Sequence, residues 1–155
     1  MHGERDCKYI LQLSHGGRQR DVPGIEYAKG LSSTDNKDPL HGFECERMST
    51  DQIQDVVKAF GQGARRAREA GADGVELHGA NGYLITQFLS SAINDRQDAY
   101  GGGLENRARF VIETSGPSVR PAWYSITFSA GSNGARSRRP RLCTAASISM
   151  RRGTP

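Results

Sequence analysis

The six residues from His78 to Tyr83, with the sequence HGANGY, bring together three side chains that can form hydrogen bonds. They are the imidazole of His78, the carboxamide of Asn81 and the phenol of Tyr83, and two glycines among them allow the backbone to bend. The short apolar segment Gly74–Leu77 directly precedes them and is predicted to be a strand. Catalytic groups of α/β proteins commonly lie on loops that leave the carboxyl ends of strands. The hexapeptide is therefore predicted to form the edge of an active site.

Each of these side chains also has a structural interpretation. His78 alone could cap the end of a strand by bonding to the backbone, and Tyr83 could be a core aromatic residue that opens the next helix. Asn81 is a residue type that tolerates positive φ in turns, and this role is compatible with a functional one. Three such residues within one short turn favour the functional interpretation.

The elements that position this turn begin with Tyr9–Leu13, a short run with the composition of a buried strand. A helix is predicted next: Ser49 and Gln52 form a capping box, and apolar residues recur at helical spacing until Gly71, a residue that favours a helix end. The strand Gly74–His78 follows. The order strand, helix, strand predicts a βαβ unit with parallel strands.

Two further helices are predicted after the turn, over Leu84–Leu89 and from Leu104 to about Thr114. The segment Gln19–Arg47 contains glycines, prolines and an Asp/Asn/Ser cluster without a usable period, and it is predicted to be a long loop. Inside the first helix, Gly61 and Gly63 would each destabilise the helix by about 1 kcal/mol relative to alanine. We expect them to allow close packing on another element.

Charge divides the chain into two parts. Residues 1–114 carry 14 Lys and Arg against 17 Asp and Glu, whereas residues 115–155 carry seven arginines and no acid, so the net charge of +4 comes from the tail. The tail is rich in Arg, Ser, Gly and Pro and is predicted to be disordered; only Trp123–Phe128 has the composition of a strand. Its arginines have no helical spacing, and no nucleic-acid partner is expected.

The cysteines and the apolar runs bear on the compartment. Cys7, Cys45 and Cys143 are far apart and form no C-x-x-C pair, so no zinc site or iron–sulfur cluster is predicted. An odd number of cysteines without a leading apolar segment fits a reducing compartment, and no run approaches the roughly 18 apolar residues of a membrane span. A cytoplasmic protein without a membrane partner is expected.

Three segments together resemble the Old Yellow Enzyme family of FMN-dependent NAD(P)H:flavin oxidoreductases and ene reductases. Ile10–Arg18 looks like the third-strand motif of that family, and Ala70–Ile85 is similar to its fourth strand and active-site turn. Asn94–Arg107 matches the signature that follows. Three motifs in the family's order are more specific than any one of them.

The resemblance implies an α/β fold, a partial (β/α)₈ TIM barrel of about two βα units that correspond to strands 3 and 4. This domain would span residues 1–114, followed by the disordered tail of residues 115–155. A complete barrel needs about 250 residues. The abrupt change near Thr114 suggests a truncated or frame-shifted product, with the tail out of frame.

The resemblance also implies a chemistry. FMN, reduced by NADH or NADPH, would pass a hydride to an activated C=C bond of an α,β-unsaturated carbonyl compound. Gln12 would bind the pyrimidine edge of FMN, His78 and Asn81 would bind the substrate carbonyl oxygen, and Tyr83 would protonate the α-carbon. From the strand pattern alone, the partner of Gln12 could equally be another side chain.

The alternative is an inactive fragment of such an enzyme that cannot hold FMN. Its open barrel edges would favour self-association. Other polar residues are expected to be structural: His15 and Arg18 at a strand end, and an ion-pair set of Asp95, Arg96 and Asp98 that fixes a loop.

Overall fold

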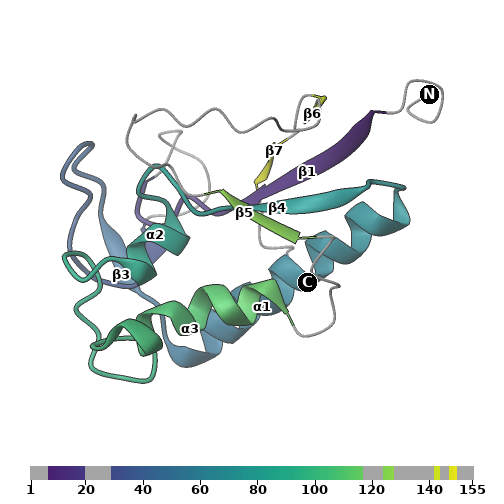
Figure 1. The fold of residues 1–155 in the computed structure, drawn as a ribbon. Helices are drawn as coiled ribbons and strands as arrows, with labels where there is room; N and C mark the ends of the chain where they lie inside the picture. Colours follow the sequence, from purple (N-terminus) through teal and green to yellow (C-terminus); the bar gives the residue numbers. More distant parts are fainter. Residues whose placement is uncertain (1–6, 20–28, 117–123, 128–141, 144–146, 150–155) are drawn as a thin grey trace, which may run out of the picture.

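The computed structural model describes residues 7–19, 29–116, 124–127, 142–143 and 147–149 (Figure 1). Its centre is a parallel β-sheet with two long helices packed side by side against one face. A third, short helix lies near the carboxyl ends of the two central strands (Figure 1). Helices on the outside of a parallel sheet are the arrangement of a βα barrel wall.

The central strands are β1 (Lys8–Ser14) and β4 (Gly74–His78). They pair in parallel, from Ile10 opposite Gly74 to Leu13 opposite Leu77. Both predicted strands and their parallel pairing are confirmed, and β1 extends one residue further at each end than predicted.

Helix α1 (Thr50–Glu69) connects these strands and begins at the predicted capping box. Ser49 Oγ accepts a hydrogen bond from Gln52 N over 3.2 Å, and Gln52 Oε1 accepts one from Ser49 N over 2.8 Å. The helix ends before Gly71, whose φ of 82° is readily adopted by glycine. Its buried face consists of Ile53, Phe60, Ala64 and Ala67.

Helices α2 (Leu84–Leu89) and α3 (Leu104–Ser115) confirm the two remaining helix predictions. Phe88 of α2 and Phe110 of α3 are fully buried, and their rings stack with centroids 4.3 Å apart. Gln54 on α1 donates to the Tyr100 hydroxyl over 2.7 Å, and that hydroxyl donates to Glu113 over 2.8 Å. These contacts join the long helices that cover the sheet.

The predicted loop over Gln19–Arg47 is wrong for two segments. Strands β2 (Gly30–Ser32) and β3 (Cys45–Arg47) pair in parallel as a separate two-stranded sheet. Three residues are too few to show a strand period in the sequence, and the pairing that defines these strands places residues 15 positions apart side by side. Residues 20–28 of the predicted loop lie outside the described residues.

Three short segments of the tail, for which disorder was predicted outside Trp123–Phe128, are strands. Strand β5 (Tyr124–Thr127) pairs with β4, as the strand composition of Trp123–Phe128 predicted, while β6 (Leu142–Cys143) and β7 (Ser147–Ser149) pair with β1. A strand edge presents unpaired N–H and C=O groups, and an extended segment satisfies them whatever its composition. Ser115 belongs to α3 and Gly116 follows it, and the remaining tail residues, including all seven arginines, lie outside the described residues. Their disorder and the absence of a nucleic-acid partner stay predictions.

Several smaller expectations have different outcomes. A Cβ atom at Gly61 would meet nothing within 4 Å, so the expected close packing at this glycine is wrong.

Cys45 is buried and free, whereas Cys7 is disulfide-bonded. In the part of the chain that the structure describes, no helix is long and apolar enough to span a membrane, and no His, Cys, Asp and Glu side chains gather as metal ligands would. The cytoplasmic location stays a prediction.

Candidate active site

The central strands have one apolar and one polar face. Their apolar side chains are buried in the core with the helices: Leu11, Leu13, Val75 and Leu77. Side chains alternate along a strand, so Gln12 lies on the opposite face of β1. Its register partner Glu76 and the next alternate residue, His78, lie on that same face of β4. In a βα barrel this face, turned away from the helices, lines the barrel interior.

The turn after β4 has an unusual backbone. Asn81 has a φ of 57° and is the one non-glycine residue with positive φ within the described ranges, and Gly82 follows with a φ of 73°. Asparagine and glycine are the residues that adopt this conformation most readily. The turn closes with a hydrogen bond from Tyr83 N to Ala80 O over 3.2 Å. The sequence N-G therefore reverses the chain directly between β4 and α2.

This turn brings His78, Asn81 and Tyr83 together. His78 Nε2 and Asn81 Nδ2 lie 3.4 Å apart, and the rings of His78 and Tyr83 have centroids 5.1 Å apart with an interplanar angle of 52°. His78 and Tyr83 are half-buried, whereas Asn81 is exposed. The two nitrogens form a long hydrogen bond in which Asn81 Nδ2 donates, because an amide nitrogen cannot accept. In the His78 tautomer that carries its proton on Nε2, both nitrogens can instead donate to one oxygen atom placed between them.

His78 Nδ1 is buried and has no hydrogen-bond partner within the described ranges. A strand-capping histidine would use this nitrogen to bond the backbone. The interpretation of His78 as a strand cap therefore has no support among the described contacts. A buried polar atom without a partner calls for an explanation, and a functional role is one.

Gln12 contacts a side chain, as the open alternative allowed. Its Nε2 donates a hydrogen bond to Glu76 Oε1 over 2.5 Å. No hydrogen bond to Gln12 Oε1 is found among the described residues, so this oxygen can still accept one from a ligand. The N3–H group on the pyrimidine edge of a flavin is such a donor, and the residues present fit the predicted cofactor at this point.

His15 and Arg18 have structural roles, as predicted. His15 Nδ1 accepts a hydrogen bond from Gly17 N over 3.0 Å, which requires the neutral ring at this nitrogen. Burial lowers the pKa of His15 from 6.5 to about 4. Arg18 is buried, and its guanidinium donates to the carbonyl oxygens of Asn36 and Lys37. These contacts fix the loop that follows β1.

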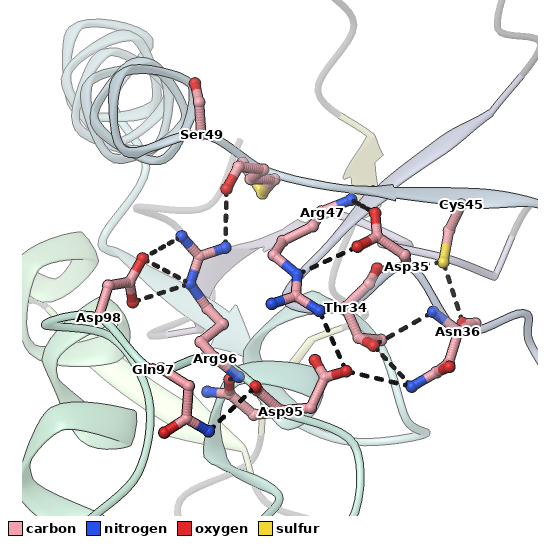
Figure 2. A network of polar contacts seen from close by, with 12 residues as sticks. Thr34, Asp35, Asn36, Cys45, Arg47, Ser49, Asp95, Arg96, Gln97 and Asp98 are labelled. Carbon is pink, nitrogen blue, oxygen red and sulfur yellow. Dashed lines mark hydrogen bonds and ion pairs between the residues drawn. The ribbon is translucent and has the colours of Figure 1, made fainter.

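Asp95, Arg96 and Asp98 form ion pairs that fix a loop, as predicted (Figure 2). Arg96 is 4% exposed, pairs with Asp98 and donates to Met48 O over 2.7 Å. Asp95 pairs instead with Arg47, with atoms 3.1 Å apart. The loop after α2 is thereby attached to the end of β3 and to the residue that follows it, just before α1.

Three residues near the site were not predicted from the sequence. Glu76 orients Gln12, and the carboxamides of Gln19 and Gln87 bond the backbone of the His78–Tyr83 turn. For Gln87 a signal exists, because it is a polar residue between Leu84, Ile85 and Phe88 on a short, mostly apolar helix, and the structure shows that it is fully buried. Gln19 has no comparable signal, since its contacts depend on how two separate loops meet.

Comparison with known proteins agrees with this geometry. The sequence profile of the NADH:flavin oxidoreductase / NADH oxidase family matches residues 2–120. A putative 12-oxophytodienoate reductase-like protein 1 from Arabidopsis thaliana is 44% identical over 131 residues, covering 78% of this chain and 40% of that protein. An NADPH dehydrogenase from a Geobacillus strain is 42% identical over 120 residues, covering 77% and 34%.

The fold also matches a solved structure. Morphinone reductase superposes with a TM-score of 0.71 and 31% identity, over 78% of this chain and 37% of that one. The chain belongs to the NADH:flavin oxidoreductase / NADH oxidase family. This result confirms the predicted resemblance to the Old Yellow Enzyme family. Its fold is part of a TIM barrel, and the family is one of FMN-dependent NAD(P)H oxidoreductases. The chain spans about two fifths or less of the length of these relatives.

Proposed function

We propose that this chain carries the substrate-binding edge of an FMN-dependent ene reductase that acts on α,β-unsaturated carbonyl compounds. The proposal depends most on one observation, the 3.4 Å separation of His78 Nε2 and Asn81 Nδ2 beside the Tyr83 ring. FMN, when bound and reduced by NADH or NADPH, supplies a hydride to the β-carbon of the substrate.

His78 and Asn81 bind the carbonyl oxygen of the substrate. When hydride reaches the β-carbon, the electron pair of the C=C bond moves toward the carbonyl, and negative charge develops on its oxygen. Two hydrogen-bond donors directed at this oxygen stabilise the transition state more than the ground state. The positive φ of Asn81 is what turns its carboxamide toward the imidazole.

Tyr83 supplies the proton that completes the reduction. The α-carbon takes the phenol proton while the oxygen regains its carbonyl form, so one hydride and one proton saturate the double bond. A phenol, with an ordinary pKa of about 10, is a suitable acid for an enolate-like carbon. Its ring contact with His78 keeps the phenol on the side of the turn that the carbonyl oxygen approaches.

Gln12 binds the pyrimidine edge of FMN through Oε1 while its Nε2 is held by Glu76. This arrangement puts the cofactor on the polar face of the sheet, next to the turn. The side chains of Gln12, Glu76 and His78 then line one continuous strip from cofactor to substrate.

Absorbance and turnover test the proposal directly. We expect the purified chain, supplied with FMN and freed of excess, to absorb at about 450 nm and to oxidise NADPH faster when a cyclic enone is added. His78→Ala should keep the flavin absorbance and lose the enone-dependent rate. A chain that stays colourless with added FMN would favour the alternative, a family fragment that does not hold the cofactor.

A further inference from the structure

Two glutamine side chains from different segments bond the backbone of the turn between His78 and Tyr83. Gln19 Nε2, in the loop after β1, lies 3.1 Å from Asn81 O and 3.2 Å from Gly82 O. Gln87 Nε2, on α2, donates to Gly82 O over 2.7 Å. We propose that Gln19 and Gln87 are positioning residues that hold Asn81 and Tyr83 in their substrate-binding arrangement. This inference rests on the proposed function of that turn.

Gln87 joins three loops at one buried point. Its Oε1 accepts hydrogen bonds from Arg18 N over 3.1 Å and from Ser32 Oγ over 2.9 Å, and its Nε2 also donates to Gly16 O over 3.2 Å. The side chain is fully buried, so every one of these bonds is shielded from water. The loop after β1, the end of β2 and the turn after β4 are therefore fixed relative to one another through a single carboxamide.

The backbone is shaped to receive these two amides. A Cβ atom at Gly17, where φ is 64°, would collide with the Gln87 carboxamide, and a Cβ at Gly82 would lie 2.6 Å from Gln19 Nε2. Both glycines thus allow an approach that no other residue type permits. The close approach places the donors where the carbonyl groups of Asn81 and Gly82 need them.

The strain of the turn explains why it needs such support. Asn81 and Gly82 are consecutive residues with positive φ, and the hydrogen bonds found for their carbonyl groups come from glutamine side chains. Among the described residues, one backbone hydrogen bond lies within the turn, from Tyr83 N to Ala80 O. Without the glutamine donors, the carboxamide of Asn81 and the phenol of Tyr83 could rotate away from His78.

Gln19→Leu tests the inference without depending on cofactor binding. Gln19 is half-buried and near the surface, so leucine is expected to leave the fold intact, whereas Gln87→Leu leaves several buried groups unpaired. In the chain without flavin, we expect Gln19→Leu to speed hydrogen exchange of the Tyr83 amide about tenfold and to weaken the NMR cross-peak between the His78 and Tyr83 rings. Gln62→Leu, an exposed substitution on α1, is the matched control and should change neither.

A ligand measurement separates positioning from simple structural support. In the flavin-loaded chain, Gln19→Leu should weaken binding of a simple phenol about tenfold and leave FMN affinity within about twofold. Exchange and cross-peak values equal to those of Gln62→Leu would overturn the inference. Failure of the chain to bind FMN would count against the proposed function alone, because the exchange and cross-peak results decide the positioning role by themselves.

Discussion

Gln12 and Glu76 face each other on neighbouring parallel strands, and the Gln12 carboxamide donates to the Glu76 carboxylate across 2.5 Å. An amide side chain can turn over and exchange its oxygen for its nitrogen. The carboxylate accepts but cannot donate, so it holds the Gln12 nitrogen toward itself and leaves the oxygen for a ligand. If Gln12 binds FMN as proposed, Glu76 thus determines which group Gln12 offers to the cofactor.

Replacing Glu76 should therefore affect the cofactor. Glu76→Leu removes the acceptor and is expected to weaken FMN affinity about five- to tenfold, measured by quenching of flavin fluorescence. Glu76→Gln keeps an acceptor oxygen at the same place and should stay within about twofold of the parent. Equal losses in the two variants would show that orientation of Gln12 is not what Glu76 provides.

Tyr83→Phe should separate the two halves of the reaction. The variant keeps the ring that contacts His78 but loses the hydroxyl, so reduction of the flavin by NADPH should be unchanged. Oxidation of the reduced flavin by an enone should slow by about 10²- to 10⁴-fold, the usual contribution of a positioned acid. Stopped-flow absorbance measures each half separately. A similar loss in both halves would contradict the proton-donor role.

His15 should make stability depend on pH. Its pKa falls from 6.5 in the unfolded chain to about 4 in the fold because the ring is buried. Between these values the unfolded chain binds more protons than the folded one, so stability falls as pH decreases below 6.5 and levels off below about 4. Between about pH 8 and about pH 5 the loss from this group is at most about 2 kcal/mol.

Urea unfolding at both pH values measures this loss. His15→Asn removes the titrating ring and should flatten the pH dependence across this window. A control is His41→Asn, at an exposed histidine that pairs with the buried carboxylate of Asp38, and it should leave the His15 contribution in place. If the unfolding free energy of His15→Asn depends on pH as strongly as that of the parent, other groups cause the loss.

Arg96→Met should destabilise the fold, because it removes bonds to Met48 O and Asp98 from a side chain that is 4% exposed (Figure 2). The expected loss is about 2–3 kcal/mol, since charged hydrogen bonds in buried positions are among the stronger ones. Arg65→Met is the matched control: Arg65 is exposed and pairs with Glu69 one helical turn away, which is worth less than about 0.5 kcal/mol. Equal losses in chemical denaturation would contradict the loop-fixing role of Arg96.

Local patterns in the sequence predicted the regular elements around the site. The Ser49–Gln52 capping box marked the start of α1, Gly71 marked its end, and the apolar runs marked β1 and β4. Each of these signals involves residues that are close in the sequence, so each can be recognised in a single short segment. The positive φ of Asn81 is in the same category, because Asn-Gly is a local turn signal.

Contacts between distant segments could not be predicted in this way. Strands β2 and β3 are three residues long and exist because they pair with each other, and the tail strands β6 and β7 exist because β1 has an open edge. The absence of close packing at Gly61 likewise depends on which face of α1 meets the sheet. None of these contacts produces a repeating pattern of apolar residues that could be recognised in the sequence.

The same division applies to the site. Residue types and spacing alone determined that an imidazole, a carboxamide and a phenol lie in one turn after a strand, because that turn is continuous in the chain. Tertiary structure decided that Gln12 bonds Glu76 and that Gln19 and Gln87 bond the turn, across separations of more than 60 residues for Gln12 and Gln19. The physical reason is that a hydrogen bond depends on distance in space, and only the packed sheet brings these groups within its range.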